Sequence, residues 1–127
     1  MVGIVVVSHS QKIAEGAMEL AKQMAPEARI AAAGGMEDGS IGTDVSKIIT
    51  AIESVSEGDG VVILVDLGSA VMSSEMAIEM LPDISQVKII DAPIVEGTIF
   101  SSVEASIGSS FDEVVEVLAG AKAYKKF

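Results

Sequence analysis

Cysteine is absent from the 127 residues of this chain. Its absence excludes disulfides, thiolate metal sites and cysteine nucleophiles, and it is compatible with a reducing cytoplasm, where we expect the protein. Aromatic residues make up only 3% of the sequence, which leaves little on which nucleic-acid bases could stack. Histidine occurs only once, so we expect no metal site.

Basic residues are also scarce. Eight lysines and arginines stand against 19 acidic residues, for a formal net charge of −11. Such a chain repels phosphate backbones and anionic lipid, so we expect neither nucleic acid nor a membrane as partner. No apolar run approaches the roughly 20 residues of a membrane-spanning helix. Half of the residues are nevertheless hydrophobic, an excess that favours an oligomer interface.

Short apolar runs alternate with segments of helical period, which predicts one α/β domain over residues 1–127. We expect a doubly wound, mainly parallel four-stranded sheet with helices on both faces, its weak second strand near an edge. The predicted strands are 2–7, 28–33, 61–66 and 87–91. The predicted helices are about 10–24, one capped by Thr43, 69–81, 93–107 and one from 110, with a glycine-dense loop over 34–42.

The single histidine, His9, directly follows the first predicted strand. Open α/β sheets place their chemistry at the carboxyl ends of strands, and an imidazole can accept a phosphoryl group as a nucleophile. In the common strand order 2-1-3-4, the first and third strands are neighbours, which brings Asp66 beside His9. The carboxylate would accept the Nδ1–H, leave Nε2 as the nucleophile and stabilise the positive ring formed on phosphorylation.

Further elements open at the same edge of the predicted sheet. They are the 34–42 loop, the Gly68-Ser69 turn and the start of the helix near Pro93. Backbone N–H groups and helix N-termini there could hold phosphate oxygens without lysine or arginine. The candidate phosphate-binding residues are Gly42, Thr43, Gly68 and Ser69.

Plainer interpretations stand beside these. A histidine at a strand end can be no more than a polar terminus, and Asp66 can be a cap or turn residue. Gly34-Gly35 and Asp38-Gly39 can simply make turns. A methionine recurs every fourth residue in the predicted third helix, for which core packing is the favoured interpretation and a dimer surface the alternative. These methionines are Met72, Met76 and Met80.

The nucleotide-binding motifs are missing. There is no G-x-x-x-x-G-K-[ST] sequence, and the first strand is not followed by G-x-G-x-x-G. A receiver domain of the phospho-aspartate type needs an acidic pair where this chain has Ser8-His9-Ser10. Phosphoryl carriage on His9 is therefore the sharpest hypothesis that the residues support.

Four motifs in register resemble one family along essentially the whole chain. They are Gly3–Ser10 (GIVVVSHS), the loop from Gly34-Gly35 to Asp44, Val65–Ala70 (VDLGSA) and Ala92–Gly97 (APIVEG). The chain resembles the phosphotransferase subunit of phosphoenolpyruvate-dependent dihydroxyacetone kinase. Relatives of that family are the enzyme IIA domains of the mannose-type sugar phosphotransferase system, which share its fold and its N-terminal histidine.

The resemblance implies that His9 accepts a phosphoryl group from the carrier protein HPr. It then passes the group to ADP held on a partner kinase subunit, whose ATP phosphorylates dihydroxyacetone on a third subunit. ADP and ATP thus belong to the partner, and no cofactor is expected on this chain. An aspartate at the end of the third strand supports the histidine in the related domains, and it matches Asp66. Homodimers are the family habit, and the chain is too short for the HPr-like and enzyme I-like domains of some members.

Two other functions remain open at this stage. One is a mannose-type IIA domain that passes its phosphoryl group to a IIB protein of a sugar permease. The other is a regulatory or ligand-binding domain in which His9 is incidental. The first shares the carrier chemistry but not the acceptor, so an acceptor assay separates it from the kinase subunit. The second requires that no phosphoryl donor labels His9.

Overall fold

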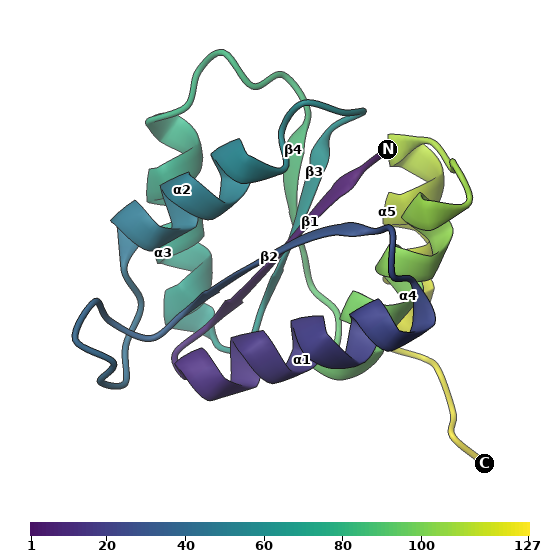
Figure 1. Ribbon diagram of the computed structural model, residues 1–127, viewed down its shortest axis with the longest axis horizontal. Helices are drawn as coiled ribbons and strands as arrows, with labels where there is room; N and C mark the ends of the chain where they lie inside the picture. The colour runs from purple at the N-terminus through teal and green to yellow at the C-terminus, as the bar shows by residue number, and fades with distance from the viewer.

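Four parallel strands form a single sheet in the order β2-β1-β3-β4 (Figure 1). The computed structural model describes all residues from 1 to 127. Strand β1 pairs with β2 and β3, and β3 pairs with β4, each pair being parallel. The predicted strand order is therefore confirmed, including the edge position of the second strand. The strands are β1 (Gly3–Ser8), β2 (Arg29–Gly34), β3 (Val61–Val65) and β4 (Val87–Ile90).

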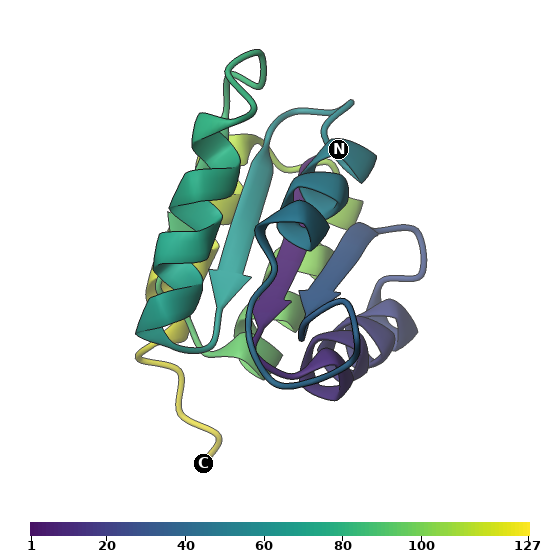
Figure 2. The same cartoon turned by 90° about the vertical axis from the view of Figure 1, so that its left-hand side faces the viewer.

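Five helices cover both faces of the sheet, as predicted. They are α1 (Gln11–Met24), α2 (Val45–Ser54), α3 (Gly68–Glu79), α4 (Ile94–Ser106) and α5 (Phe111–Ala121). One face packs against α1, α4 and α5, and the other against α2 and α3, which lie in front of the sheet in Figure 2. None of these helices has the length and apolarity that crossing a bilayer requires.

A hydrophobic core lies on each face of the sheet. Strand β1 contributes side chains to both cores, because successive side chains of a strand point to opposite faces. Ile4 and Val6 join the core under α1, α4 and α5, whereas Val5 and Val7 join the core under α2 and α3. All six residues of β1 are buried. The strand that leads into His9 is therefore held on both sides, which makes its carboxyl end a rigid base for a site.

The cap of α2 differs from the prediction. Asp44, not Thr43, precedes the first helical residue with extended backbone angles. Its carboxylate accepts hydrogen bonds from the backbone N–H groups of Ser46 and Lys47, at 2.9 and 3.4 Å. Thr43 lies one residue too early to reach these groups. Both residue types are good caps, so composition alone does not choose between them.

The three methionines of α3 and its C-terminal end are exposed, so the core-packing interpretation is wrong. Their exposed fractions are 69% for Met72, 55% for Met76 and 64% for Met80. The helix instead buries the small residues Ala70, Ser74 and Ala77. Small side chains let the helix axis come close to the sheet and to α2, and this turns the long side chains toward solvent.

Candidate active site

His9 and Asp66 directly follow β1 and β3, two strands that pair with each other. Strands β1 and β3 pair in register up to Val7 and Val65, so the residues that follow lie at the same edge. The Nδ1 atom of His9 lies 2.9 Å from Oδ1 of Asp66. The two side chains are 20% and 18% exposed, respectively. The structure thus brings together the pair that the predicted strand order placed at adjacent strand ends.

The carboxylate of Asp66 is held by several donors. Its Oδ2 accepts the backbone N–H of His9 at 2.9 Å and the hydroxyl of Ser8 at 2.8 Å. Its Oδ1 accepts the backbone N–H of Leu67 at 2.8 Å in addition to the imidazole. These contacts leave the carboxylate little freedom to rotate, so it fixes the orientation of the imidazole ring.

The hydrogen bonds to Asp66 also set its charge. Burial raises the pKa of this carboxyl, but hydrogen bonds from the backbone and ring of His9 and from Ser8 outweigh burial and lower the pKa below its ordinary value. Asp66 is therefore ionised at neutral pH and accepts a hydrogen bond from Nδ1–H of His9. In the neutral ring, Nε2 then carries the lone pair.

The hydroxyl of Ser69 is within hydrogen-bond distance of that lone pair. Its Oγ is 2.5 Å from Nε2 of His9, and the tautomer set by Asp66 makes the serine hydroxyl the donor. Ser69 belongs to the first turn of α3, which begins at Gly68 and has no side-chain cap. The first backbone N–H groups of a helix lack partners within the helix, and the positive end of its dipole favours an anion. An anion bonded to Nε2 would therefore meet a hydroxyl and a helix N-terminus.

Gly42 and Thr43 contact the site in another way than as phosphate ligands. The N–H of Gly42 donates to the backbone carbonyl of His9 at 2.9 Å. Gly42 has a φ of 145°, which glycine adopts without strain. The hydroxyl of Thr43 lies 2.6 Å from that of Ser73 on α3. Both residues hold the 35–44 loop against the site, and their role as phosphate ligands stays a prediction.

Ser8 is the residue of the candidate site that sequence reasoning missed. Besides its bond to Asp66, its Oγ accepts the backbone N–H of Ser10 at 3.0 Å, and the residue is fully buried. A serine that closes an otherwise apolar strand was the available signal. Ser10 in turn caps α1 by accepting the N–H of Ile13. The segment Ser8–Ser10 thus joins the end of β1, His9 and the start of α1 in one hydrogen-bonded turn.

No group of three or more potential metal-ligating side chains lies together in the structure. The site instead combines one imidazole, one fixed carboxylate, one hydroxyl and one helix N-terminus. These are the parts that phosphoryl transfer onto an imidazole needs, because such transfer depends mainly on positioning and on electrostatic stabilisation.

Comparison with known proteins places this geometry in a family. Residues 3–115 match the family EIIA-man, described as the PTS system fructose IIA component. The chain is 45% identical over 121 residues to the phosphoryl donor subunit DhaM of the PEP-dependent dihydroxyacetone kinase of Escherichia coli. The match covers 91% of this chain but 26% of that protein, so the chain spans about a quarter of the length of that relative.

A second relative matches along nearly its full length. The phosphoryl donor subunit DhaM of the PEP-dependent dihydroxyacetone kinase 2 of Listeria innocua is 36% identical, over 93% of this chain and 97% of that protein. Among solved structures, the crystal structure of EF1359, a protein of unknown function, superposes with a TM-score of 0.86. It is 35% identical, and the match covers 99% of this chain and 98% of that one. The chain therefore belongs to the EIIA-man family of phosphotransferase system components, and the relatives that it resembles are named as phosphoryl donor subunits of dihydroxyacetone kinase.

Proposed function

We propose that this chain is a phosphohistidine relay, in which His9 receives a phosphoryl group from phosphorylated HPr and passes it to ADP on a partner subunit of dihydroxyacetone kinase. The observation that carries the proposal is the bond of 2.9 Å between Nδ1 of His9 and the ionised Asp66. It holds the Nε2 lone pair toward Ser69 and the N-terminus of α3. The names of the relatives support the kinase as the assembly served.

In the loading step, the Nε2 lone pair of His9 attacks the phosphorus on the donor histidine. The new Nε2–P bond forms as the donor N–P bond breaks, and the donor ring keeps the electron pair of that bond. The ring of His9 becomes positive, and the charge of Asp66 stabilises it. Ser69 must rotate away from Nε2, and its hydroxyl then donates to a phosphoryl oxygen together with the first N–H groups of α3.

In the discharge step, a terminal oxygen of ADP attacks the same phosphorus. The Nε2–P bond breaks, its electron pair returns to the imidazole, and ATP forms on the partner. The nucleotide thus stays on the partner, and this chain needs no cofactor of its own. We place the relay in the cytoplasm, where HPr and the nucleotide would meet it.

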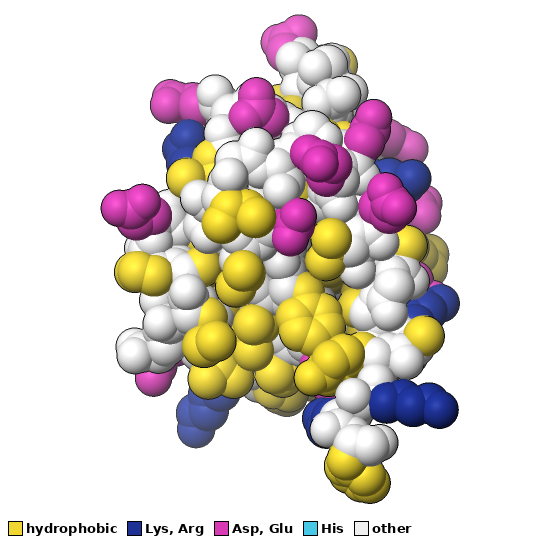
Figure 3. Space-filling model, turned by 90° about the vertical axis from the view of Figure 1, so that its right-hand side faces the viewer, with side chains coloured by type: hydrophobic (Ala, Val, Ile, Leu, Met, Phe, Trp, Pro, Cys, Tyr) yellow, Lys and Arg dark blue, Asp and Glu magenta, His cyan; other side chains and the backbone are white.

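Self-association through α4 is part of the proposal. This helix buries small residues such as Gly97, Ser101 and Ala105 and exposes Val95 and Val103. Figure 3 shows hydrophobic side chains gathered on the lower half of the molecular face that α4 and α5 present. A second copy of the chain would cover this surface in a homodimer.

The test is a reconstitution with phosphoenolpyruvate, enzyme I and HPr. We expect an acid-labile, base-stable phosphate on the chain and none on His9→Ala. Addition of the ADP-loaded kinase subunit should then discharge it with formation of ATP. Labelling that persists in His9→Ala would refute the assignment. Discharge onto a IIB protein, with none onto the kinase subunit, would favour the second candidate, a sugar-specific IIA domain, which the description of the matched family supports.

A further inference from the structure

Ser69, His9 and Asp66 are connected by a chain of hydrogen bonds. The hydroxyl oxygen of Ser69 lies 2.5 Å from Nε2 of His9, and Nδ1 of the same ring lies 2.9 Å from Oδ1 of Asp66. A serine hydroxyl, an imidazole and a carboxylate in this order are the parts of a catalytic triad that transfers acyl groups. Such a triad is recognised by its geometry and by the role of each group, whatever the fold. The phosphohistidine relay leaves the serine oxygen without a role as a nucleophile.

The proton positions along this chain of bonds suit a serine that is activated by a base. The ionised Asp66 accepts Nδ1–H, so Nε2 of His9 accepts the hydrogen bond from the hydroxyl of Ser69. The carboxylate is itself held by the backbone N–H of Leu67 and the hydroxyl of Ser8. The ring therefore takes the hydroxyl proton without turning, and the positive ring that results lies against a fixed negative charge.

Backbone N–H groups without partners lie beside the serine hydroxyl. Ser69 is the second residue of α3, so neither its N–H nor that of Gly68 has a partner within the helix. The N–H of Ala70, in contrast, donates to the carbonyl of Leu67 at 3.0 Å. The first two N–H groups and the positive end of the helix dipole are therefore available to an oxygen that becomes negative when a carbonyl carbon is attacked.

The serine lies in solvent beside a hollow. Ser69, Leu67 and Gly68 are all exposed. Leu67 and Gly68 also line a hollow of about 440 Å³, in which Val71 and Ile89 provide apolar wall. Hollows of this volume take small organic molecules. A small ester can therefore approach the hydroxyl of Ser69 from solvent, with its leaving group in the hollow.

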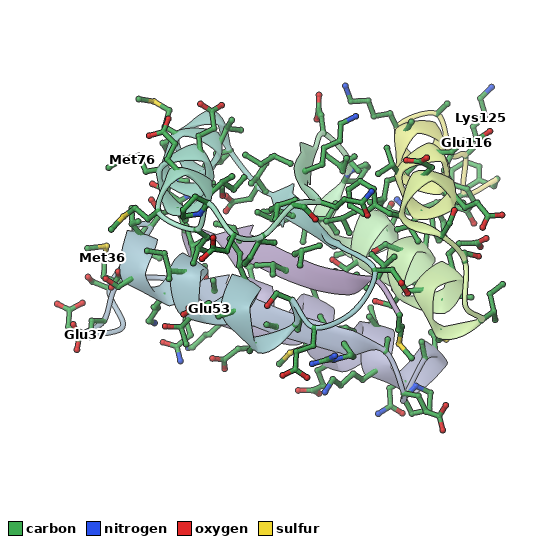
Figure 4. The ribbon with its side chains drawn as sticks, turned by 90° about the horizontal axis from the view of Figure 1, so that it is seen from above. Met36, Glu37, Glu53, Met76, Glu116 and Lys125 are labelled. Atoms are coloured by element: carbon green, nitrogen blue, oxygen red, sulfur yellow. The ribbon has the colours of Figure 1, made fainter.

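The charge around the hollow is mainly negative. Three of its eight lining residues carry carboxylates, namely Asp66, Glu75 and Asp91. Lys122 pairs with Asp91, but α3 itself contains no lysine or arginine. Figure 4 shows Lys125 on the opposite side of the molecule from Met76 of α3. These surroundings repel an anionic substrate, so they favour an ester without a negative charge.

We propose that Ser69, activated by His9 and Asp66, is an acyl-accepting nucleophile that hydrolyses small uncharged esters. Its Oγ attacks the carbonyl carbon while Nε2 takes the hydroxyl proton, and the bond to the leaving alcohol breaks as that alcohol receives the proton. Water then attacks the acyl group on Oγ, and Nε2 passes a proton from the water to Oγ as the carboxylic acid leaves. The reaction needs no phosphoryl donor, so it goes beyond the relay function and does not depend on it.

Hydrolysis of p-nitrophenyl acetate by the chain without any phosphoryl donor tests the proposal. Ser69→Ala and Asp66→Asn are each expected to lower kcat/KM about tenfold or more, because the first removes the nucleophile and the second no longer fixes the base. Ser46→Ala is the matched control and should keep the wild-type rate. Ser46 is likewise an exposed serine at the second position of a helix, α2, but its hydroxyl makes no hydrogen bond with the imidazole. Far-UV circular dichroism shows whether each variant is folded.

A covalent label identifies the attacking atom. The Oγ of Ser69 should displace fluoride from phenylmethanesulfonyl fluoride, and tandem mass spectrometry should locate the sulfonyl group on Ser69 in the wild type and in Ser46→Ala. A wild-type rate of ester hydrolysis in Ser69→Ala, or an acetyl or sulfonyl group found on His9, would overturn the proposal, because the imidazole would then be the nucleophile. A chain that reacts with neither reagent would overturn it as well.

Discussion

Helices α3 and α4 pack against the sheet in the same way but differ in the side chains that they expose to solvent. Both bury small residues against the sheet, Ala70 and Ala77 in one and Gly97 and Ala105 in the other. Both therefore turn large apolar side chains outward. On α3 these are unbranched methionines, whereas on α4 they are β-branched residues such as Val103.

The two outer faces therefore differ in side-chain flexibility. A methionine side chain has several rotatable bonds, so its shape can adapt to whatever covers it. A β-branched side chain is already restricted and loses less entropy on burial, which suits a lasting interface between two copies. Of these two helices, only α3 has its first turn in contact with His9, so the variants below separate the chemistry proposed at that contact from the self-association proposed for α4.

The largest effect is expected at Asp66, which lies between β3 and α3. Asp66→Asn should lower the rate constant for loading of His9 by about a hundredfold, because the amide neither fixes the tautomer nor stabilises the positive ring. Single-turnover labelling with phosphorylated HPr measures this rate. A wild-type rate would show that Asp66 only caps the strand end.

A substitution on α4 should alter self-association and leave the loading of His9 unchanged. Val103→Glu places a charge in the proposed homodimer surface, and we expect the chain to sediment as a monomer while the loading rate of His9 stays unchanged. Analytical ultracentrifugation measures the mass, with Met76→Glu as the matched substitution on α3. Dissociation by Met76→Glu instead of Val103→Glu would reverse the assignment of the two helices.

Ser69→Ala should slow loading by about tenfold. The lost hydroxyl no longer donates to the phosphoryl oxygen, while the N–H groups of α3 remain to share the charge. Rapid-quench labelling provides the rate, and far-UV circular dichroism shows whether the fold is intact. Faster loading in Ser69→Ala would mean that the hydroxyl at 2.5 Å from Nε2 only blocks the nucleophile.

The lowered pKa of Asp66 also makes stability depend on pH. Its ordinary value is 3.8, and the folded value lies below it. The stabilisation from the ionised carboxylate is therefore complete above the unfolded pKa and is lost as pH falls through the folded pKa. Urea unfolding should show wild type more stable than Asp66→Asn at pH 7, with the gap closing in acid. A gap that does not change with pH would contradict this.

The smallest effect is expected where the loop joins α3. Thr43→Val removes the hydroxyl that lies 2.6 Å from Ser73 and should lower the free energy of unfolding by about 1 kcal/mol. Thermal denaturation is the measurement. Ser40→Ala, which changes a bond made within the loop itself, controls for loop substitutions in general. An equal loss in both variants would show that the Thr43–Ser73 bond contributes no more to the free energy of unfolding than a bond within the loop.

Much of the fold was predictable because its signals are local. The run from Val61 to Val65 is apolar on both faces, as a central parallel strand is. Right-handed crossovers then leave few strand orders. His9 and Asp66 could be paired from this topology alone. The cap of α2 was misjudged because Thr43 and Asp44 are neighbours of nearly equal capping strength, and the choice depends on where the backbone turns.

The orientation of α3 was not predictable in the same way. Its apolar residues are spread around the helix, so no face stands out as the buried one, and the spacing of Met72, Met76 and Met80 imitates a core stripe. Ala70, Ser74 and Ala77 form an alternative buried face. Close packing against the sheet and α2 selects the smaller set, a decision that involves residues distant in sequence.

The amino-acid sequence by itself determined the order of the elements, the sheet and the meeting of His9 with Asp66, since hydrophobic period, turn residues and handedness act over short stretches of chain. Only the tertiary structure decided that Ser69 lies on Nε2, that Ser8 and Leu67 hold the carboxylate, and that the methionines face solvent. The contacts of Ser8 with Asp66 and of Ser69 with His9 join residues about 60 positions apart, and their geometry depends on how closely small side chains let the helices approach the sheet.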